Sequence, residues 1–405
     1  VDCSDNEVNI KILLNALVSA GDLTAKQRNN LLYSMTDEVG DLVIQDCYRQ
    51  TQSISISHLG GASQLKEQLR FIHGLEREGY LNRELEFIPS DDEISDRLAK
   101  SMGLTRPELS VLLAYGKMVL KEKFNIPSIT SNPYHGKLLV EAFPKILQEK
   151  FSAQMEQHPL RGEIIATKLT NNIINDMGMN FVFRIQEETG ASIDEIANSY
   201  VIVKGIFGLE NLWREIETLD SSIDAQMQLS MLETMRRTLR RASRWYLRHG
   251  NKALSIADAI SSYESTFKDL FTNIESYLVE DEFKQLDSNR TFYTDAGVPE
   301  KIAYRVASLS NMFPCMDLAQ VAETEKRDIK LVANLYFKLG SKLEVHWFLE
   351  QINNQPVNNH WQALARASYR EELDWQQRAL TTVLLNSSPK SADAEEILKK
   401  WLYVS

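Results

Sequence analysis

Apolar residues recur at intervals of three and four positions along much of this 405-residue chain. That spacing places side chains on one face of an α-helix and is typical of a helix packed against a core. Three stripes of this kind are the clearest: Ile10, Leu13, Leu14 and Leu17; Leu109, Leu112, Leu113, Gly116 and Leu120; and Ile223, Met227, Met231, Met235 and Leu239. We therefore predict an amphipathic helix in each segment, the first of them ending at Gly21.

Five residue pairs match the capping-box pattern, in which Ser or Thr is followed three residues later by Glu or Gln. In a capping box the two side chains satisfy backbone N–H groups that are left free at the helix N-terminus. Each pair precedes an apolar-periodic segment, so each predicts a helix start. The pairs are Ser4/Glu7, Thr24/Gln27, Ser90/Glu93, Thr105/Glu108 and Ser192/Glu195.

Glycine and proline are scarce, with 17 and 10 residues respectively. Because both residues interrupt helices, their scarcity favours long helices over an all-β fold with many tight turns. Only two short segments resemble strands, Ile54–Ile56 and Leu85–Ile88. The predicted fold class is therefore all-α, predominantly helical with few short strands at most.

Four segments rich in small, polar or turn-forming residues predict loops, at 58–63, 125–133, 288–299 and 353–359. The clearest break is the first one, which contains Gly60-Gly61. We place a division of the chain there, at about residue 58. It separates residues 1–57 from residues 58–405, which we expect to form an α-helical domain.

The charge balance is negative, with 45 Lys and Arg against 56 Asp and Glu and a net charge of −11. A negative chain is a poor general binder of polyanions, so we expect neither nucleic acid nor a membrane as a partner. The longest apolar stretch, Tyr200–Leu209, is short and contains Lys204, which argues against a membrane span. Nothing near Val1 resembles a signal peptide, and the chain starts without an initiator methionine, so we expect a piece of a longer, cytoplasmic protein.

Three cysteines, Cys3, Cys47 and Cys315, lie far apart, and no C-x-x-C motif occurs. This pattern is typical of a reducing compartment and disfavours both a disulfide framework and a structural zinc site. The seven histidines do not pair at spacings of three or four residues, so the sequence predicts no metal ligands. His158-Pro159 favours a helix start with Pro159 near the first helical position.

An arginine stripe is the strongest charge feature of the chain, formed by Arg236, Arg237, Arg240, Arg241, Arg244 and Arg248. Positions 236, 240, 244 and 248 share one helical face. One interpretation is a face for phosphate or nucleic acid, with Trp245 or Tyr246 stacking on bases. The other, which the acidic background favours, is a stripe paired with acidic faces of neighbouring helices or subunits.

Other polar and aromatic residues carry weaker signals. Asn171, Asn172 and Asn175 are expected to be buried amides that hydrogen-bond to a neighbouring helix, with a ligand pocket as the alternative. Trp213, Trp347, Trp361 and Trp375 are expected to anchor the core or an interface.

The usual catalytic motifs are missing from the sequence. It contains no G-x-G-x-x-G for a dinucleotide and no G-x-x-x-x-G-K for a nucleotide phosphate. It also lacks H-E-x-x-H for zinc and the G-x-S-x-G nucleophile elbow. The residues by themselves therefore indicate a helical, non-catalytic module without catalytic, cofactor or metal residues.

Several segments nevertheless resemble the large bacterial NAD-specific glutamate dehydrogenases. The first nine residues, Val1-Asp2-Cys3-Ser4-Asp5-Asn6-Glu7-Val8-Asn9, resemble the segment that closes the catalytic core of that family. Other stretches are similar to its C-terminal region, most specifically within the first two hundred residues. These stretches are Leu85–Ser90, Leu104–Leu109, Val111–Tyr115 and the run from His158 through Ala191.

This resemblance implies the C-terminal part of a longer enzyme that oxidatively deaminates L-glutamate to 2-oxoglutarate and ammonia. NAD and the catalytic residues would belong to an upstream domain, which would be a partner within the same polypeptide. Residues 1–57 would complete the catalytic core. Residues 58–405 would serve structure, oligomerisation or regulation in a homo-oligomer.

The resemblance also implies two substrate-binding residues. Smaller glutamate dehydrogenases carry a G-V-x-x-S element that lines the glutamate pocket, and Val1 and Ser4 match its valine and serine. A serine at a helix N-terminus suits a carboxylate, although Ser4 could equally cap its own helix. Two alternatives to the enzyme fragment remain at this stage: a free-standing helical scaffold without catalysis, and a phosphate- or nucleic-acid-binding helical protein.

Overall fold

A computed structural model describes residues 4–356 and 360–404. The regular elements in these residues are all helices and none of them is a strand, so the predicted all-α class is confirmed. The chain divides into two compact units, Val1–Val201 (unit 1) and Ile202–Ser405 (unit 2). The division at about residue 58 concerns the role of residues 1–57 and stays a prediction.

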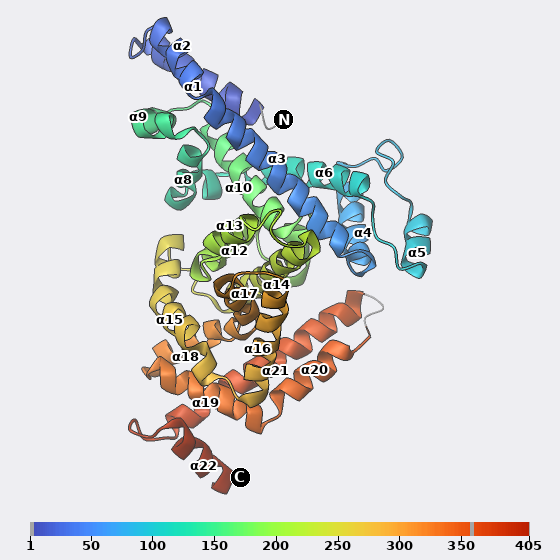
Figure 1. The fold of residues 1–405 in the computed structure, drawn as a ribbon, viewed down its shortest axis with the longest axis vertical. Helices are drawn as coiled ribbons and strands as arrows, with labels where there is room; N and C mark the ends of the chain where they lie inside the picture. Colours follow the sequence, from blue (N-terminus) through green and yellow to red (C-terminus); the bar gives the residue numbers. More distant parts are fainter. Residues whose placement is uncertain (1–3, 357–359, 405) are drawn as a thin grey trace. The chain divides into compact units, whose positions relative to one another are not determined.

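Unit 1 is a helical assembly in which most consecutive elements are joined by short turns, with a longer connection, residues 78–90, between α4 and α5 (Figure 1). Its first element is a π-helical turn, η1, and its last helix, α12, runs across the boundary into unit 2. The elements are η1 (Ser4–Val8), α1 (Asn9–Ala20), α2 (Ala25–Ser34), α3 (Thr36–Leu59), α4 (Ala62–Arg77), α5 (Asp91–Ala99), α6 (Arg106–Phe124), α7 (Pro127–Thr130), α8 (Pro133–Glu141), α9 (Lys145–Met155), α10 (Arg161–Met177), α11 (Phe181–Thr189) and α12 (Ile193–Ile206).

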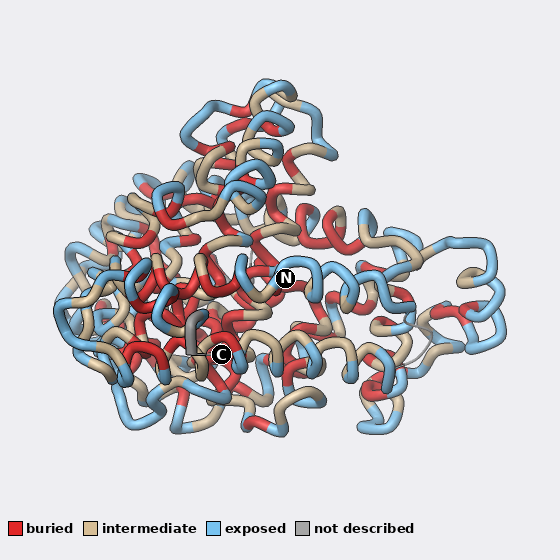
Figure 2. The backbone as a smooth tube through the Cα atoms, turned by 90° about the horizontal axis from the view of Figure 1, so that it is seen from below, coloured by how far each residue is buried: buried red, intermediate tan, exposed pale blue. Residues whose placement is uncertain are grey.

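The core of unit 1 is built around α10, which packs against α3, α6, α7 and α8. Its apolar residues are spread around the helix, and Ile164, Ile165, Leu169, Ile173 and Ile174 are all buried. So many buried positions are typical of a helix that its neighbours cover over most of its surface. Most other helices alternate buried and exposed positions, as amphipathic helices do (Figure 2).

The long helix α3 connects the start of the chain to this core. It lies beside α10 and also packs on α6 (Figure 1). The Ser53 hydroxyl donates a hydrogen bond to the carbonyl oxygen of Ile174, 2.9 Å away. Residues 1–57 are thereby joined to α10 through a buried contact.

In its described residues, unit 2 begins with the end of α12 and continues through ten further helices. They are α13 (Leu209–Glu217), α14 (Ala225–His249), α15 (Ile256–Tyr277), α16 (Glu280–Asp295), α17 (Glu300–Met312), α18 (Cys315–Glu325), α19 (Ile329–Lys342), α20 (Val345–Asn354), α21 (His360–Asn386) and α22 (Ala394–Val404).

The central helix of unit 2 is α19, which packs against α15, α18, α20, α21 and α22. Gly340 lets it approach α21 closely, because a Cβ atom there would lie 2.5 Å from the Gln377 side-chain nitrogen. That nitrogen donates a hydrogen bond to the carbonyl oxygen of Tyr336 at 2.9 Å. Met231 and Met235 of the predicted methionine stripe are fully buried in this unit.

Several predicted helix starts and ends are confirmed. Thr24/Gln27 and Ser90/Glu93 form complete capping boxes at the starts of α2 and α5. At the starts of α6 and α12, the N–H groups of Thr105 and Ser192 donate to the glutamates three residues later. Gly21 ends α1 with a φ of 82°, a conformation that glycine adopts readily.

Both strand predictions are wrong. Ile54 and Ile56 lie in α3, where five of the six residues 52–57 are buried because neighbouring helices cover this helix on more than one side. The segment 85–88 lies in turns between α4 and α5, where the Phe87 side chain is 87% exposed and its φ is 54°.

One predicted boundary is wrong, and one predicted helix start lies two residues from the observed one. The loop expected at 288–299 is mostly helix, because α16 continues to Asp295 and anchors Leu286 and Tyr293 in the core. Pro159 lies before α10, which begins at Arg161. The predicted loop at 353–359 includes residues 357–359, which lie outside the described residues. Within the parts of the chain that are described, no helix is both long and apolar enough to span a bilayer.

Candidate functional site

The two predicted substrate residues lie at the very start of the chain. Val1 is outside the described residues, and Ser4 is described only through its backbone, which opens η1. The contacts of Val1 and Ser4 with glutamate therefore stay predictions. The residues that follow, Asn6 and Asn9, lead into a cavity of unit 1.

This cavity, called the polar cavity below, has a volume of about 100 Å³. It lies where η1, α1 and α3 meet α6 and α10, so residues of the first 57 positions and of the later helices line it together. Its charges balance, since two lysines face two acids. The lining residues are Asn6, Asn9, Asp46, Lys121, Ala142, Leu160, Glu163, Ile164, Thr167, Lys168 and Asn171.

His158 forms hydrogen bonds to two residues that line the polar cavity, Asn9 and Leu160. Its Nδ1 accepts a hydrogen bond from the Leu160 N–H at 3.0 Å, so its Nε2 carries the proton and donates to the carbonyl oxygen of Asn9 at 3.2 Å. Burial lowers the pKa of His158, which favours the neutral ring that these two hydrogen bonds require. The histidine therefore ties the start of α10 to the start of α1.

The three asparagines singled out from the sequence have different surroundings. Asn171 lines the polar cavity, as the ligand-pocket alternative expected. The carbonyl oxygen of Asn172 accepts a hydrogen bond from the Tyr200 hydroxyl at 3.3 Å. Asn175 is 4% exposed and thus buried, as the structural interpretation expected.

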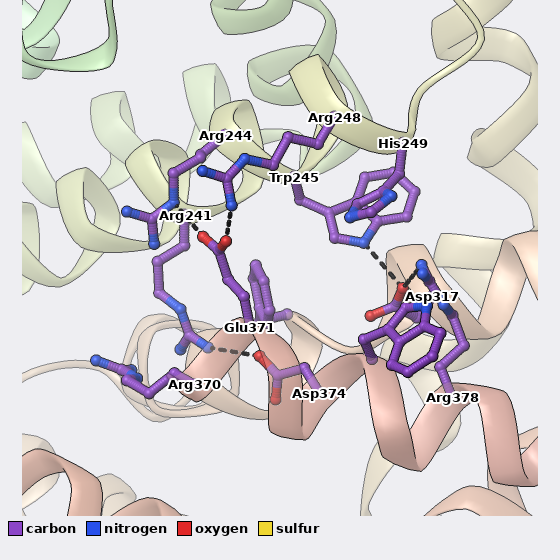
Figure 3. A pocket seen from close by; sticks show the side chains of 12 residues that line it. Arg241, Arg244, Trp245, Arg248, His249, Asp317, Arg370, Glu371, Asp374 and Arg378 are labelled. Carbon is purple, nitrogen blue, oxygen red and sulfur yellow. Dashed lines mark hydrogen bonds and ion pairs between the residues drawn. The ribbon is translucent and has the colours of Figure 1, made fainter. Parts of the chain in front are cut away.

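A second cavity, the arginine–carboxylate pocket, lies in unit 2 between α14, α18 and α21 (Figure 3). Its volume is about 40 Å³. The predicted arginine stripe provides one wall of it, and α21 provides the opposite one. The lining residues are Arg241, Arg244, Trp245, Arg248, His249, Phe313, Asp317, Arg370, Glu371, Asp374, Trp375 and Arg378.

Ion pairs cross this pocket from α14 to α21. Arg244 lies 2.7 Å from Glu371, and Arg248 pairs with the other oxygen of the same carboxylate. Arg241 lies 3.7 Å from Asp374. The prediction that the stripe pairs with acids of a neighbouring helix is confirmed for these three arginines.

The floor of the pocket is a buried carboxylate, Asp317 of α18. It accepts hydrogen bonds from the indole N–H of Trp245 at 2.9 Å and from Arg378 at 2.5 Å (Figure 3). Burial raises the pKa of Asp317, while these two donors favour its ionised form. Trp245 and Arg378 are thus held in fixed orientations by one acid.

Burial also shifts the other charged groups of the pocket. It lowers the pKa of Arg241 to about 10, an effect that the neighbouring Arg370 reinforces. It raises the pKa of Asp374 to about 6, although Arg241 opposes that shift. These groups interact in a partly dry environment, where electrostatic interactions are stronger than in water.

The described residues do not fit NAD or a metal. They form no strand–turn–helix unit, and the chain has no glycine-rich fingerprint to hold a pyrophosphate. Among the described residues, no group of three or more His, Cys, Asp or Glu side chains is placed to hold a metal ion.

Sequence reasoning missed the residues that α18 and α21 contribute to the arginine–carboxylate pocket. The arginine stripe on α14 could be recognised in the sequence, but its partners Glu371 and Asp374 lie more than a hundred residues further along the chain. A signal did exist, because Arg370, Asp374 and Arg378 follow one another at four-residue spacing on one face of α21. Nothing local to α21 indicates which helix would face it.

Two known protein families match this helical chain. The family described as glutamate dehydrogenase, C-terminal, matches residues 101–404. The catalytic domain of bacterial NAD-glutamate dehydrogenase matches residues 1–57. These matches define the class, a helical region that accompanies a dehydrogenase catalytic domain. The chain belongs to the glutamate dehydrogenase C-terminal family, as the resemblance in its sequence implied.

Known bacterial proteins are similar to this chain over nearly its whole length. The NAD-specific glutamate dehydrogenases of Pseudomonas aeruginosa and Halomonas elongata are 41% and 39% identical to it over 99% of the chain. That of Mycobacterium tuberculosis is 33% identical over the whole chain. The chain spans 25% of the length of each of these relatives.

Proposed function

We propose that this chain is the C-terminal part of an NAD-specific glutamate dehydrogenase that converts L-glutamate to 2-oxoglutarate and ammonia. NAD binds to the upstream part of the polypeptide, and residues 1–57 complete the catalytic core. Residues 58–405 support that core and the assembly of subunits. The proposal includes a cytoplasmic location and contact of Val1 and Ser4 with glutamate.

The observation that carries the proposal is the packing of α3. This helix belongs to the segment that matches a catalytic domain, while α6 and α10 belong to the segment that matches the C-terminal family. The three helices pack together within unit 1. The end of the catalytic segment is thus supported by the C-terminal helices, which favours the enzyme fragment over a free-standing scaffold.

An exposed aromatic face supports the assembly role. Trp361, Tyr369, Trp375 and Val383 lie on one side of the 27-residue helix α21 and are 46–76% exposed. Trp347 and Phe348 of the adjacent α20 are also about half exposed. Exposed aromatic residues grouped on one side of a helix are typical of protein interfaces.

We assign this α21 face to contact with a second copy of the chain. Its apolar residues are spaced along about 33 Å of a regular helix, a length suited to side-by-side packing of two copies. Within that face Glu372 is the charged residue, so two copies meet with little like-charge repulsion.

The experiment that tests the proposed function compares the 405-residue chain with the same chain joined to an upstream region of the relatives' length. L-glutamate-dependent reduction of NAD is measured by absorbance. We expect activity only in the longer protein. Activity in the 405-residue chain alone, or a longer protein that binds NAD yet does not oxidise glutamate, contradicts the proposal.

A further inference from the structure

Guanidinium groups outnumber carboxylates in the arginine–carboxylate pocket. Five arginines and three acids line it, so the lining carries two more positive than negative formal charges. The arginines are Arg241, Arg244, Arg248, Arg370 and Arg378, and the acids are Asp317, Glu371 and Asp374.

The ion pairs show how the acids are shared. Glu371 serves both Arg244 and Arg248. Asp374 interacts electrostatically with both Arg241 and Arg370. Each of these two carboxylates is therefore shared between two guanidinium groups.

Three groups of the pocket respond to this surplus of positive charge. Burial is the main cause that lowers the pKa of Arg370. Asp374 opposes this shift, whereas the positive charges of Arg244 and Arg366 add to it. The pKa of His249 is lowered by burial and further by Arg378 and Arg248. The pKa of Arg241 is likewise lowered by burial and by the positive charge of Arg370. An added anion would relieve each of these repulsions.

The guanidinium groups are also held in place before any ligand arrives. Arg241 lies over the ring of Phe313, 3.9 Å from its centroid. Asp317 fixes Arg378 at 2.5 Å. Figure 3 shows Arg241 directed toward Asp374. It also shows Arg378 directed toward Asp317. Pre-oriented donors lower the entropic cost of binding.

We propose that the arginine–carboxylate pocket binds a small oxyanion, meaning the carboxylate or phosphate groups of a small molecule. Guanidinium forks match both groups geometrically, because each presents paired oxygen acceptors. A cavity of about 40 Å³ has room for a few water molecules or one compact anionic group. This site is separate from the proposed dehydrogenase activity.

Isothermal titration calorimetry of the 405-residue chain tests the proposal, with inorganic pyrophosphate and succinate as probes. We expect saturable binding of at least one probe with a Kd of about 1 mM or tighter. Binding of pyrophosphate alone identifies a phosphoryl ligand, and binding of succinate alone identifies a carboxylate ligand. Failure of both probes to bind overturns the proposal.

Substitutions with opposite expected effects separate a binding site from a structural ion-pair network. Arg370→Gln should weaken binding by about 10-fold or more, since it removes a charged donor. Asp374→Asn should strengthen binding, because it removes a competing carboxylate. Arg237→Gln is the matched control, because this arginine of α14 is largely exposed and pairs with Glu233 of its own helix.

Circular dichroism and thermal melting establish that each variant is folded. If Arg370→Gln unfolds, the affinity of Asp374→Asn for the probe still tests the proposal, because a damaged pocket would not bind its ligand more tightly. Equal affinity of wild type, Arg370→Gln and Asp374→Asn overturns the assignment of the anion to this pocket.

Discussion

The hydroxyl of Ser53 lies 2.9 Å from the carbonyl oxygen of Ile174, and it donates a hydrogen bond there in the interior of unit 1. That carbonyl also accepts the N–H of Gly178 near the end of α10. Ser53 belongs to the segment matched by a dehydrogenase catalytic domain, and Ile174 belongs to the segment matched by the C-terminal family. One hydrogen bond therefore joins the two matched segments.

Ser53→Ala should destabilise unit 1 by about 0.5–1.5 kcal/mol, since a buried hydrogen bond is lost while the shape is nearly kept. Urea unfolding monitored by circular dichroism measures the change. Thr51→Ala is the control, because Thr51 is exposed and its hydroxyl bonds within its own helix. That control should change stability by less than about 0.5 kcal/mol. Equal losses in the two variants would show that the contact with α10 contributes nothing.

We expect the stability of unit 2 to depend on pH because of Glu282, whose pKa is shifted. Burial raises its pKa from 4.5 to about 7. The folded state therefore binds more protons than the unfolded state between these values, and stability falls as pH rises from about 4.5 through 7. Glu282→Gln should remove this fall and stabilise the chain at pH 8 by on the order of 1–3 kcal/mol. Thermal melting at pH 5 and pH 8 provides the comparison.

Glu280→Gln is the matched control for that experiment. Glu280 lies in the same first turn of α16, but it is exposed, and Lys284 lowers its pKa through a hydrogen bond. Its removal should leave the fall in stability between pH 5 and pH 8 intact. A Glu282→Gln variant that keeps the wild-type pH profile would show that Glu282 is not the responsible group.

Tyr369→Lys combined with Val383→Lys should weaken self-association of the chain by about 10-fold or more, because two charges would enter the apolar α21 face. Both residues lie outside the arginine–carboxylate pocket. Sedimentation velocity over a range of concentrations measures the effect. Leu85→Lys, which alters an equally exposed apolar residue of unit 1, is the control. A wild-type chain that stays monomeric at every concentration would refute the assigned interface.

Ser4→Ala in the longer enzyme should lower kcat/KM for glutamate by about 10- to 150-fold, the loss expected for one hydrogen bond to a charged carboxylate. Ser4→Gly distinguishes this role from capping, since glycine is a tolerable N-cap that costs only a few tenths of a kcal/mol. We expect both variants to be similarly impaired in steady-state kinetics. Recovery in the glycine variant alone would assign Ser4 to the helix cap.

Local features of the fold could be predicted from the sequence. The stripe that begins at Ile10 and the cap at Ser90 depend on residues three or four positions apart, so the sequence contains the whole interaction. The strand prediction at Ile54 failed for the opposite reason. Its burial is imposed by α6 and α10, which a window of neighbouring residues does not contain.

The two cavities could not be predicted from the sequence for the same reason. The arginines of α14 were visible as a stripe, but the surplus of charge exists only because Arg370 and Arg378 face them from α21. The polar cavity likewise combines Asn6 with Lys168. Neither combination follows from spacing along the chain, because both arise from tertiary packing.

The packing of α3 determines where this chain can be divided. The match to the catalytic domain ends at residue 57, within the last turn of a continuous helix that ends at Leu59. A cut at that residue would remove the cover from α6 and α10 and expose apolar surface. A single residue inserted before Ser53 would turn that side chain about 100° away from Ile174. The limit of the catalytic match is therefore not a limit of independent folding.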